Sequence, residues 1–167
     1  MLPRRHLCPG EKRGPAVGPT RKGKGTKLLV LVERSGLPLG VCLAAASVAE
    51  VDLAEATLAQ VAVPRGGPGR PKQKPARLIA DRGYTSYLLW ARLRRRGIDL
   101  IVPPKRNVVH RYQDGRKLRR YRRRWIIERT ISWLLSFKRL VVRCERRLDL
   151  YRAFVHVACL WIVLRRL

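Results

Sequence analysis

The stretch RLIADRGYTSYLLWARLRRRGIDLIV, residues 77–102, decides the fold that we expect for this chain. It opens with a short apolar run that ends at Asp81, which is typical of a buried strand with an acid at its carboxyl end. Thr85 or Ser86 can cap a helix, and Gly97 can end that helix before a second apolar run. The pattern therefore predicts a βαβ unit and an α/β fold class.

Asp81 is the first candidate functional residue, because ligands of such units bind where the strands end. Asp99 comes early in the second strand, so it does not share this position. An aspartate before Arg82 and Gly83 can also be a turn residue that bonds the backbone. Both interpretations of Asp81 stay open at this point.

The second candidate is Glu128, within YRRRWIIERTISWLL at residues 121–135. Helical spacing places Tyr121, Arg124 and Glu128 on one face, and it places Ile127 on a separate apolar face. The alternative for Glu128 is a helix salt bridge with a neighbouring arginine, which contributes only about 0.3–0.5 kcal/mol if it is exposed.

A strand-end aspartate and a helical glutamate can together bind a divalent cation. Their carboxylate oxygens are hard ligands, which suit Mg²⁺ or Mn²⁺. Paired ions of this kind serve in-line displacement at phosphorus. If the two side chains converge, Asp81 and Glu128 are the predicted catalytic acids and metal ligands.

The charge of the chain indicates a polyanionic partner. Its 167 residues include 38 Lys and Arg against 11 Asp and Glu, a formal net charge of +27. Twenty of these cations lie between residues 92 and 147 with only four acids, so the positive field surrounds the candidate site. The four cysteines form no CxxC pair, which indicates a reducing compartment and no structural zinc. No secretory or membrane-spanning segment is evident, so we expect a cytoplasmic, nucleoid-associated protein without membrane contact.

Two segments carry a family resemblance, LIADRGYTSYLLWARLRRRGIDLIVPPKRN and YRRRWIIERTISWLLSFKRLVVRCERR. They resemble the second and third blocks of the DDE transposases of bacterial insertion sequences, whose catalytic domain has the RNase H-like fold. The resemblance extends from about Val17 to the end of the chain. It implies an RNase H-like mixed sheet with flanking helices, with Asp81 as the second catalytic acid and Glu128 as the third.

The helix around the third acid follows the family signature with one departure. Tyr121 and Arg124 match its tyrosine and arginine, and the signature continues to a basic residue after the glutamate. Here that position is Leu135, and the nearest cations are Lys138 and Arg139. The last contact of the signature is therefore not assigned.

In the family the first catalytic aspartate comes from the opening central strand, upstream of the Gly-Lys-Gly-Thr segment. This chain has no aspartate before Asp52, and its sole upstream acid, Glu11, lies in a Pro/Gly-flanked loop. We therefore expect a basic, Gly/Pro-rich, disordered segment at residues 1–27. Residues 28–167 are expected to form a partial RNase H-like transposase catalytic domain that lacks the first central strand. Such a chain should bind DNA but be catalytically inactive alone.

The resemblance also implies partners and chemistry. A transposase binds the inverted-repeat ends of its element and target DNA, and with a complete DDE triad it performs Mg²⁺- or Mn²⁺-dependent cleavage and strand transfer. An upstream-frame product or a second copy of the chain would be a further partner. The alternative is a catalytically inactive, basic nucleic-acid-binding protein, derived from a transposase or unrelated to one. The expected DNA contacts are Lys105, Arg106, Arg119, Arg120, Tyr121, Arg124, Arg129, Lys138 and Arg139.

The remaining elements follow from local patterns. Residues 28–33 and 37–46 predict a β-hairpin, and residues 51–60 predict a helix. A cationic helix is expected at residues 139–147. Residues 151–167 predict a helix whose apolar stripe packs in the core, with a partner-helix interface as the alternative. That stripe consists of Phe154, Val157, Ala158, Leu160, Trp161 and Leu164.

Overall fold

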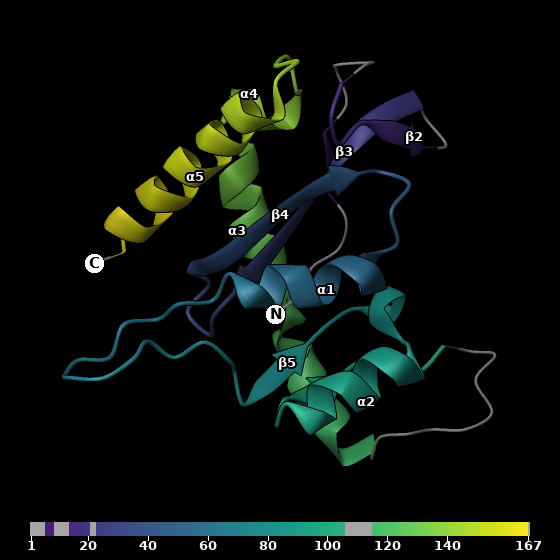
Figure 1. The fold of residues 1–167 in the computed structure, drawn as a ribbon, viewed down its shortest axis with the longest axis vertical. Helices are drawn as coiled ribbons and strands as arrows, with labels where there is room; N and C mark the ends of the chain where they lie inside the picture. The colour runs from purple at the N-terminus through teal and green to yellow at the C-terminus, as the bar shows by residue number, and fades with distance from the viewer. Residues whose placement is uncertain (1–5, 9–13, 21–22, 106–114, 167) are drawn as a thin grey trace.

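The computed structural model describes residues 6–8, 14–20, 23–105 and 115–166, so the predicted residues Glu11 and Arg106 lie outside the described part. The strands are β1 (His6–Cys8), β2 (Gly18–Thr20), β3 (Gly23–Val32), β4 (Pro38–Ala45), β5 (Arg77–Ile79) and β6 (Asp99–Ile101). The α-helices are α1 (Glu50–Ala59), α2 (Tyr87–Arg95), α3 (Trp125–Leu135), α4 (Lys138–Val141) and α5 (Leu148–Leu164). Two 3₁₀ helices, η1 (Arg82–Tyr84) and η2 (Gly115–Arg124), complete the described elements, and Figure 1 shows their arrangement.

The predicted hairpin is confirmed, with β3 and β4 paired antiparallel from Thr26 opposite Ala45. β3 begins at Gly23, inside the segment that was expected to be disordered. β1 and β2 also pair antiparallel with β3, which gives a four-stranded sheet. The long β3 therefore organises the first half of the fold.

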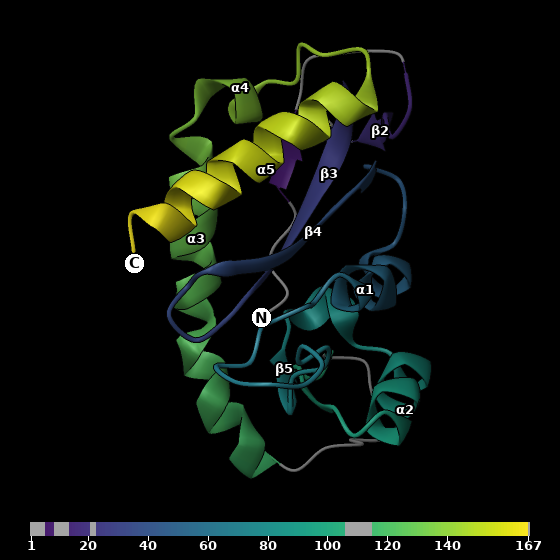
Figure 2. The ribbon, with the colours of Figure 1, turned by 60° about the vertical axis from the view of Figure 1, so that its left-hand side comes forward.

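β3 is buried on both of its faces, because alternate side chains of a strand point in opposite directions. Leu29 and Leu31 belong to a core that they share with α1, α2, β5 and β6. Leu28, Val30 and Val32 belong to a second core, formed with α3, α4 and α5. Figure 2 shows the resulting layers, with α3 and α5 on one side of the hairpin and α1 on the other.

The predicted βαβ unit is also confirmed. β5 and β6 pair in parallel, with Arg77 opposite Asp99. Ser86 caps α2 by accepting a hydrogen bond of 3.3 Å from the Leu89 amide. After the helix the chain reverses at Gly97, whose positive φ of 74° is a conformation that favours glycine.

The sheets containing β3 and β5 do not pair with each other among the described strands. Beyond Leu28, only β4 pairs with β3, and β5 pairs only with β6 in the part of the chain described. A groove with a volume of about 460 Å³ lies where the two sheets approach, and side chains of both β3 and β5 line it. The mixed sheet that was predicted therefore occurs as two separate sheets.

The expectation of a cationic helix at residues 139–147 is wrong, because α4 ends at Val141. Arg143 is only 1% exposed, and its guanidinium donates to the Glu145 carbonyl (2.9 Å), the Thr26 hydroxyl (2.6 Å) and the Pro15 carbonyl (3.0 Å). A buried charged group must be hydrogen-bonded, and these partners come from three segments of the chain. The backbone leaves the helix so that Arg143 can reach them.

The apolar stripe of α5 also differs from expectation. Of the residues predicted to pack, only Ala158 is buried, while the others are 39–62% exposed. The helix packs instead through an adjacent stripe, Tyr151, Val155, Ala158 and Ile162. No helix in the described ranges has both the length and the apolar character needed to cross a membrane.

Candidate active site

Asp81 stands at the carboxyl end of β5, as the sequence predicts. The Ala80 amide donates a 3.0 Å hydrogen bond to the Ile101 carbonyl, which extends the pairing of β5 and β6 up to this point. Asp81 Oδ1 then accepts a 2.8 Å hydrogen bond from the Gly83 amide and caps η1. The turn-forming role of Asp81 is thus confirmed, and any chemical role would be additional to it.

A second carboxylate lies beside Asp81 that the sequence analysis did not single out. Glu50, the first residue of α1, is only 8% exposed. A Cβ placed on Gly83 would overlap the Glu50 carboxylate and lie 2.9 Å from Asp81 Oδ1, so both acids lie close against this glycine and a larger residue would displace them. Glu50 is 3.8 Å from the ammonium group of Lys27, which also donates to the Val48 carbonyl. The available signal was an acid at the start of a predicted helix, but that pattern does not show burial.

Tyr84 is fully buried next to these acids. Burial is the largest cause that raises the pKa of Tyr84 well above its ordinary value, and the negative charges of Glu50 and Asp81 raise it further. The phenol is therefore protonated throughout the physiological pH range. The phenol is thus buried, whereas Asp81 is half-buried and Gly83 is exposed.

Glu128 has the opposite surroundings, on the exposed side of α3. Its Oε1 accepts a 2.6 Å hydrogen bond from Arg124, and the same guanidinium donates at 3.0 Å to the Tyr121 hydroxyl. The Glu128 side chain remains 45% exposed. Burial alone would lower the pKa of Arg124, but its bonds to Tyr121 and Glu128 outweigh burial and raise that pKa. The three residues predicted to share one face are thus joined in a hydrogen-bonded chain.

Their unequal spacing matches a change of helix type. Tyr121 and Arg124 lie in η2, and in a 3₁₀ helix residues three apart are aligned. Glu128 lies in α3, where residues four apart share a face. The switch from 3₁₀ to α geometry at Trp125 therefore keeps all three side chains in line.

These residues alone do not fit a two-metal centre. Among residues 6–8, 14–20, 23–105 and 115–166, no group of three or more His, Cys, Asp and Glu side chains could hold a metal ion. Asp81 lies against Glu50, which a buried lysine neutralises, and Glu128 lies against Arg124. The donor set is therefore incomplete, and no catalytic step follows from the described residues by themselves.

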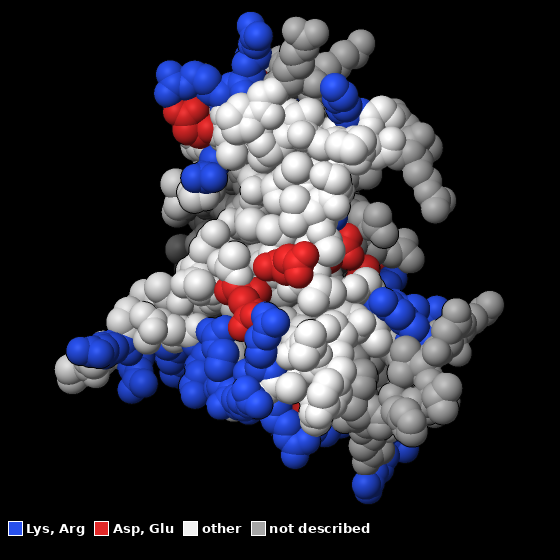
Figure 3. All heavy atoms as spheres, turned by 45° about the vertical axis from the view of Figure 1, so that its right-hand side comes forward, with Lys and Arg blue, Asp and Glu red and all other residues white. Residues whose placement is uncertain are grey.

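Exposed cations are most concentrated in η2. In η2, seven of the ten residues are Lys or Arg and none is buried. Arg119 and Arg120 are exposed there, as is Lys105 after β6, whereas Lys117 is held by Asp99 at 2.8 Å. Figure 3 shows Lys and Arg crowded over the lower part of the face in view, with several acids across the middle and further cations along the upper edge.

Arg129, one of the predicted DNA contacts, is engaged within the protein. It donates a 2.6 Å hydrogen bond to the Ser35 carbonyl in the β3–β4 turn. Its guanidinium also lies 4.8 Å from the ring centre of Trp125 and 4.7 Å from that of Trp133. This stacking fixes the hairpin turn to α3, although Trp125 remains 54% exposed.

The two cations nearest to the end of the family signature lie in α4. Lys138 and Arg139 are both exposed. Arg139 donates a 2.8 Å hydrogen bond to Glu145 and stacks over Phe154 at 5.5 Å. Both residues lie in α4, which packs against α5. In the sequence, α3 separates them from η2.

Comparison with known proteins identifies the family of the chain. Residues 9–163 match the family model of the transposase DDE domain. The chain is also 35% identical, over 170 aligned residues, to the putative transposase for insertion sequence element IS402 of Burkholderia cepacia, covering 98% of this chain and 77% of that protein. No solved structure is significantly similar. The chain therefore belongs to the DDE transposases of insertion sequences.

Proposed function

We propose that this chain binds the ends of an insertion sequence, with Asp81 and Glu128 as the second and third acids of its catalytic triad. One observation carries the proposal: Glu128 is bonded to Arg124 and Tyr121 at the end of the most cationic segment of a DDE transposase domain. The reaction of this class is in-line displacement at a phosphodiester, which divalent metal ions support. The inverted repeats and the target DNA would be its substrates.

The surroundings of Glu128 support a role beyond a helix salt bridge. An exposed pair of this type contributes little to stability, so stability alone does not explain a three-residue chain of bonds. Arg124 orients the carboxylate and leaves it accessible to a ligand. The neighbouring cations of η2 would attract the phosphate that the site acts on.

The first acid of the triad would come from a strand that fills the groove between β3 and β5. Its apolar lining includes Leu31 and Leu78, which suits the apolar side chains of a strand. A strand at this position could pair with both β3 and β5 and would join the two sheets into the mixed sheet that the family resemblance implies. Cations on the rim of the groove would attract an acid carried by that strand; they are Arg34, Lys72, Lys74, Arg77, Arg120 and Arg123.

DNA binding is the part of this proposal that the chain should perform alone. We expect the exposed cations Arg119, Arg120, Arg122 and Arg123 of η2 to contact phosphates. Four phosphate contacts correspond to a slope of about −3.6 in log affinity against log salt, so replacing all four by glutamine should weaken binding on the order of a thousandfold at about 0.1 M salt.

The matched control removes the same charge from the other half of the molecule. A variant with glutamine at Arg146, Arg152, Arg165 and Arg166, all exposed, has an equal net charge. Fluorescence anisotropy with a labelled duplex, titrated at several salt concentrations, separates the two variants. Equal losses of affinity and salt slope in both would contradict a DNA surface centred on η2.

A catalytically inactive nucleic-acid-binding protein is the second candidate. The observation that favours it is the incomplete donor set among the described acids. For such a protein, Asp81→Ala and Glu128→Ala would leave nucleic-acid affinity unchanged. Neither the wild-type chain nor the two variants would cleave the nucleic acid.

A further inference from the structure

A narrow arm, residues 63–72, lies between α1 and β5 in the sequence. Val63 and Lys72 close it at its base, where the backbone amide of each donates to the carbonyl of the other at 3.0 and 2.8 Å. Val63 packs against the core that contains α1, whereas residues 64–72 are all exposed. Figure 1 shows this segment projecting sideways from the body of the molecule. The arm is therefore anchored at one end and open to a partner at the other.

The composition of the arm makes its tip thin and restricts its backbone. Residues 64–72 comprise three prolines, three glycines, two arginines and one lysine, with no acid among them. Proline fixes one backbone angle, and glycine adds no side chain. A Cβ placed on Gly66 or Gly67 would meet no atom within 4 Å, so the tip is surrounded by open space. Gly69 has a positive φ of 124°, a conformation that favours glycine where the chain turns back.

Two arginines, Arg65 and Arg70, flank this tip. Both are exposed, and neither forms an ion pair with any acid in the described part of the chain. A Cβ placed on Gly69 would lie 3.9 Å from Cδ and Nη1 of Arg65, so the Arg65 side chain runs alongside the tip. The end of the arm is thus a thin edge of backbone with guanidinium groups available to an anionic ligand.

This combination fits the minor groove of duplex DNA better than the phosphate backbone. The minor groove is only about 6 Å wide, so a segment with bulky side chains does not fit in it. In A·T tracts the groove is narrowest and its potential is most negative, which favours inserted arginines. Phosphate contacts need cations but no particular thinness of the segment that carries them. The glycine tip therefore indicates insertion into a groove.

The base of the arm lies next to the proposed DNA contacts of η2. Lys72 and, just beyond the arm, Lys74 line the same groove of the protein as Arg120 and Arg123. A duplex whose phosphates contact η2 can therefore present its minor groove to the arm. The arm and η2 would then hold the duplex together, each through a different part of the DNA.

We propose that residues 63–72 form a minor-groove-binding arm, which inserts Arg65, Arg70 and the glycine tip into an A·T-rich stretch of the bound duplex. The inference rests on the proposed DNA binding and adds a source of sequence preference to it. The cations of η2 supply affinity through phosphates. The arm distinguishes A·T from G·C pairs, because guanine places an amino group in the minor groove.

Fluorescence anisotropy with three labelled duplexes of equal length tests which groove is read. The first has a central A·T tract and the second a central G·C tract. The third replaces guanine in that tract by inosine, which keeps the major-groove pattern of G·C but lacks the amino group in the minor groove. The full wild-type chain should bind the A·T and inosine duplexes about tenfold more tightly than the G·C duplex. Equal affinity for all three, or an inosine duplex that behaves like G·C, would overturn the proposal.

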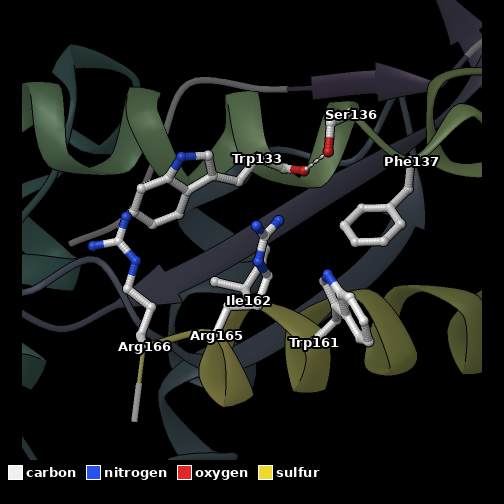
Figure 4. Close-up of a pocket in the computed structure, with 7 residues that line it drawn as sticks. All are labelled: Trp133, Ser136, Phe137, Trp161, Ile162, Arg165 and Arg166. Carbon is white, nitrogen blue, oxygen red and sulfur yellow. Dashed lines mark hydrogen bonds between the residues drawn. The ribbon is translucent and has the colours of Figure 1, made fainter.

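The double variant Arg65→Gln, Arg70→Gln should lose the preference for A·T. The matched control is Arg165→Gln, Arg166→Gln, which removes the same charge. Both control arginines line a cavity of about 280 Å³ between α3 and α5, where Arg166 stacks on Trp133 at 3.9 Å (Figure 4). The control should keep the preference. A preference that survives in the arm variant, or is lost equally in both, would contradict reading by the arm.

Gly67→Leu tests insertion of the tip without changing any charge. Because the space around Gly67 is open, circular dichroism should show unchanged folding. The added side chain is too bulky for the minor groove, so affinity for the A·T duplex should fall towards that for the G·C duplex. An unchanged preference in this variant would show that the tip stays outside the groove.

The same titrations separate a failure of this inference from a failure of the proposed DNA surface. If replacing the four arginines of η2 weakens binding to all three duplexes, but the wild-type chain shows no A·T preference, the DNA surface stands and the arm proposal is wrong. If the wild-type chain binds none of the duplexes, both are wrong.

Discussion

The carboxylates of Glu50 and Glu128 have opposite surroundings. Glu50 is buried, lies against Gly83 and is the counter-ion of buried Lys27. Glu128 is 45% exposed and follows a segment of mostly Lys and Arg. The same chemical group is therefore buried beside a lysine in one place and open to solvent in the other. The difference shows that burial, rather than residue type, separates the two environments.

The largest effect should come from Glu50→Ala, because it leaves Lys27 buried without its counter-ion. Breaking a buried ion pair from one side costs about 3–5 kcal/mol of unfolding free energy, measurable by urea denaturation. Glu55→Ala is the control in the same helix, since its partners Arg92 and Arg96 are exposed, and its cost should be under about 1 kcal/mol. Similar costs for the two variants would mean that Glu50 is available for another role.

Tyr84→Phe tests the burial of the phenol. The raised pKa of Tyr84 means that the folded protein holds the phenolic proton more tightly than the unfolded chain does. Its stabilising effect is therefore complete below pH 10 and is lost as pH rises above it, by about 1.4 kcal/mol per pH unit. Comparing urea unfolding at pH 9 and pH 11, the wild-type chain should lose about that much more stability than Tyr84→Phe. Equal losses would show that the phenol reaches solvent.

Asp81→Asn should have a smaller effect on folding. The asparagine side chain can still accept from the Gly83 amide, but the bond loses its charge, so we expect a loss of about 1 kcal/mol or less. Thermal unfolding measures this change. A loss as large as that of Glu50→Ala would place Asp81 with the structural acids.

Glu128→Gln should be the smallest of these changes in stability. The exposed bond to Arg124 contributes under about 0.5 kcal/mol, which urea unfolding would barely resolve. In a complete transposase the same substitution should abolish cleavage. A large destabilisation would instead favour a structural role for the bonded chain of Tyr121, Arg124 and Glu128.

Local patterns were sufficient to predict the elements that place the two candidate acids. The apolar runs next to Asp81 and Asp99 are short and continuous, which is typical of buried strands. The hairpin and α1 were predicted from similarly local patterns of apolar residues. The alignment of Tyr121, Arg124 and Glu128 was also predictable, because it depends only on helical spacing. These features are determined by residues close together in the sequence.

The features that were missed depend on distant partners. Arg143 looks like any surface cation until Thr26 and Pro15 approach it from the start of the chain. Glu50 is recognisable as a site neighbour only after Gly83 packs against it. On α5, two apolar seams lie side by side, and the sequence does not indicate which one the fold covers.

The central claim is that Asp81 and Glu128 are the second and third acids of the catalytic triad, and that the first acid reaches the site on a strand between β3 and β5. The most direct measurement is Mg²⁺-dependent cleavage of a labelled inverted-repeat duplex, by this chain alone and by the chain joined to an upstream-encoded strand that ends in aspartate. The account predicts binding without cleavage for the chain alone, cleavage for the extended chain, and its loss in Asp81→Asn or Glu128→Gln. Cleavage by the chain alone, or cleavage that survives both substitutions in the extended chain, would contradict it.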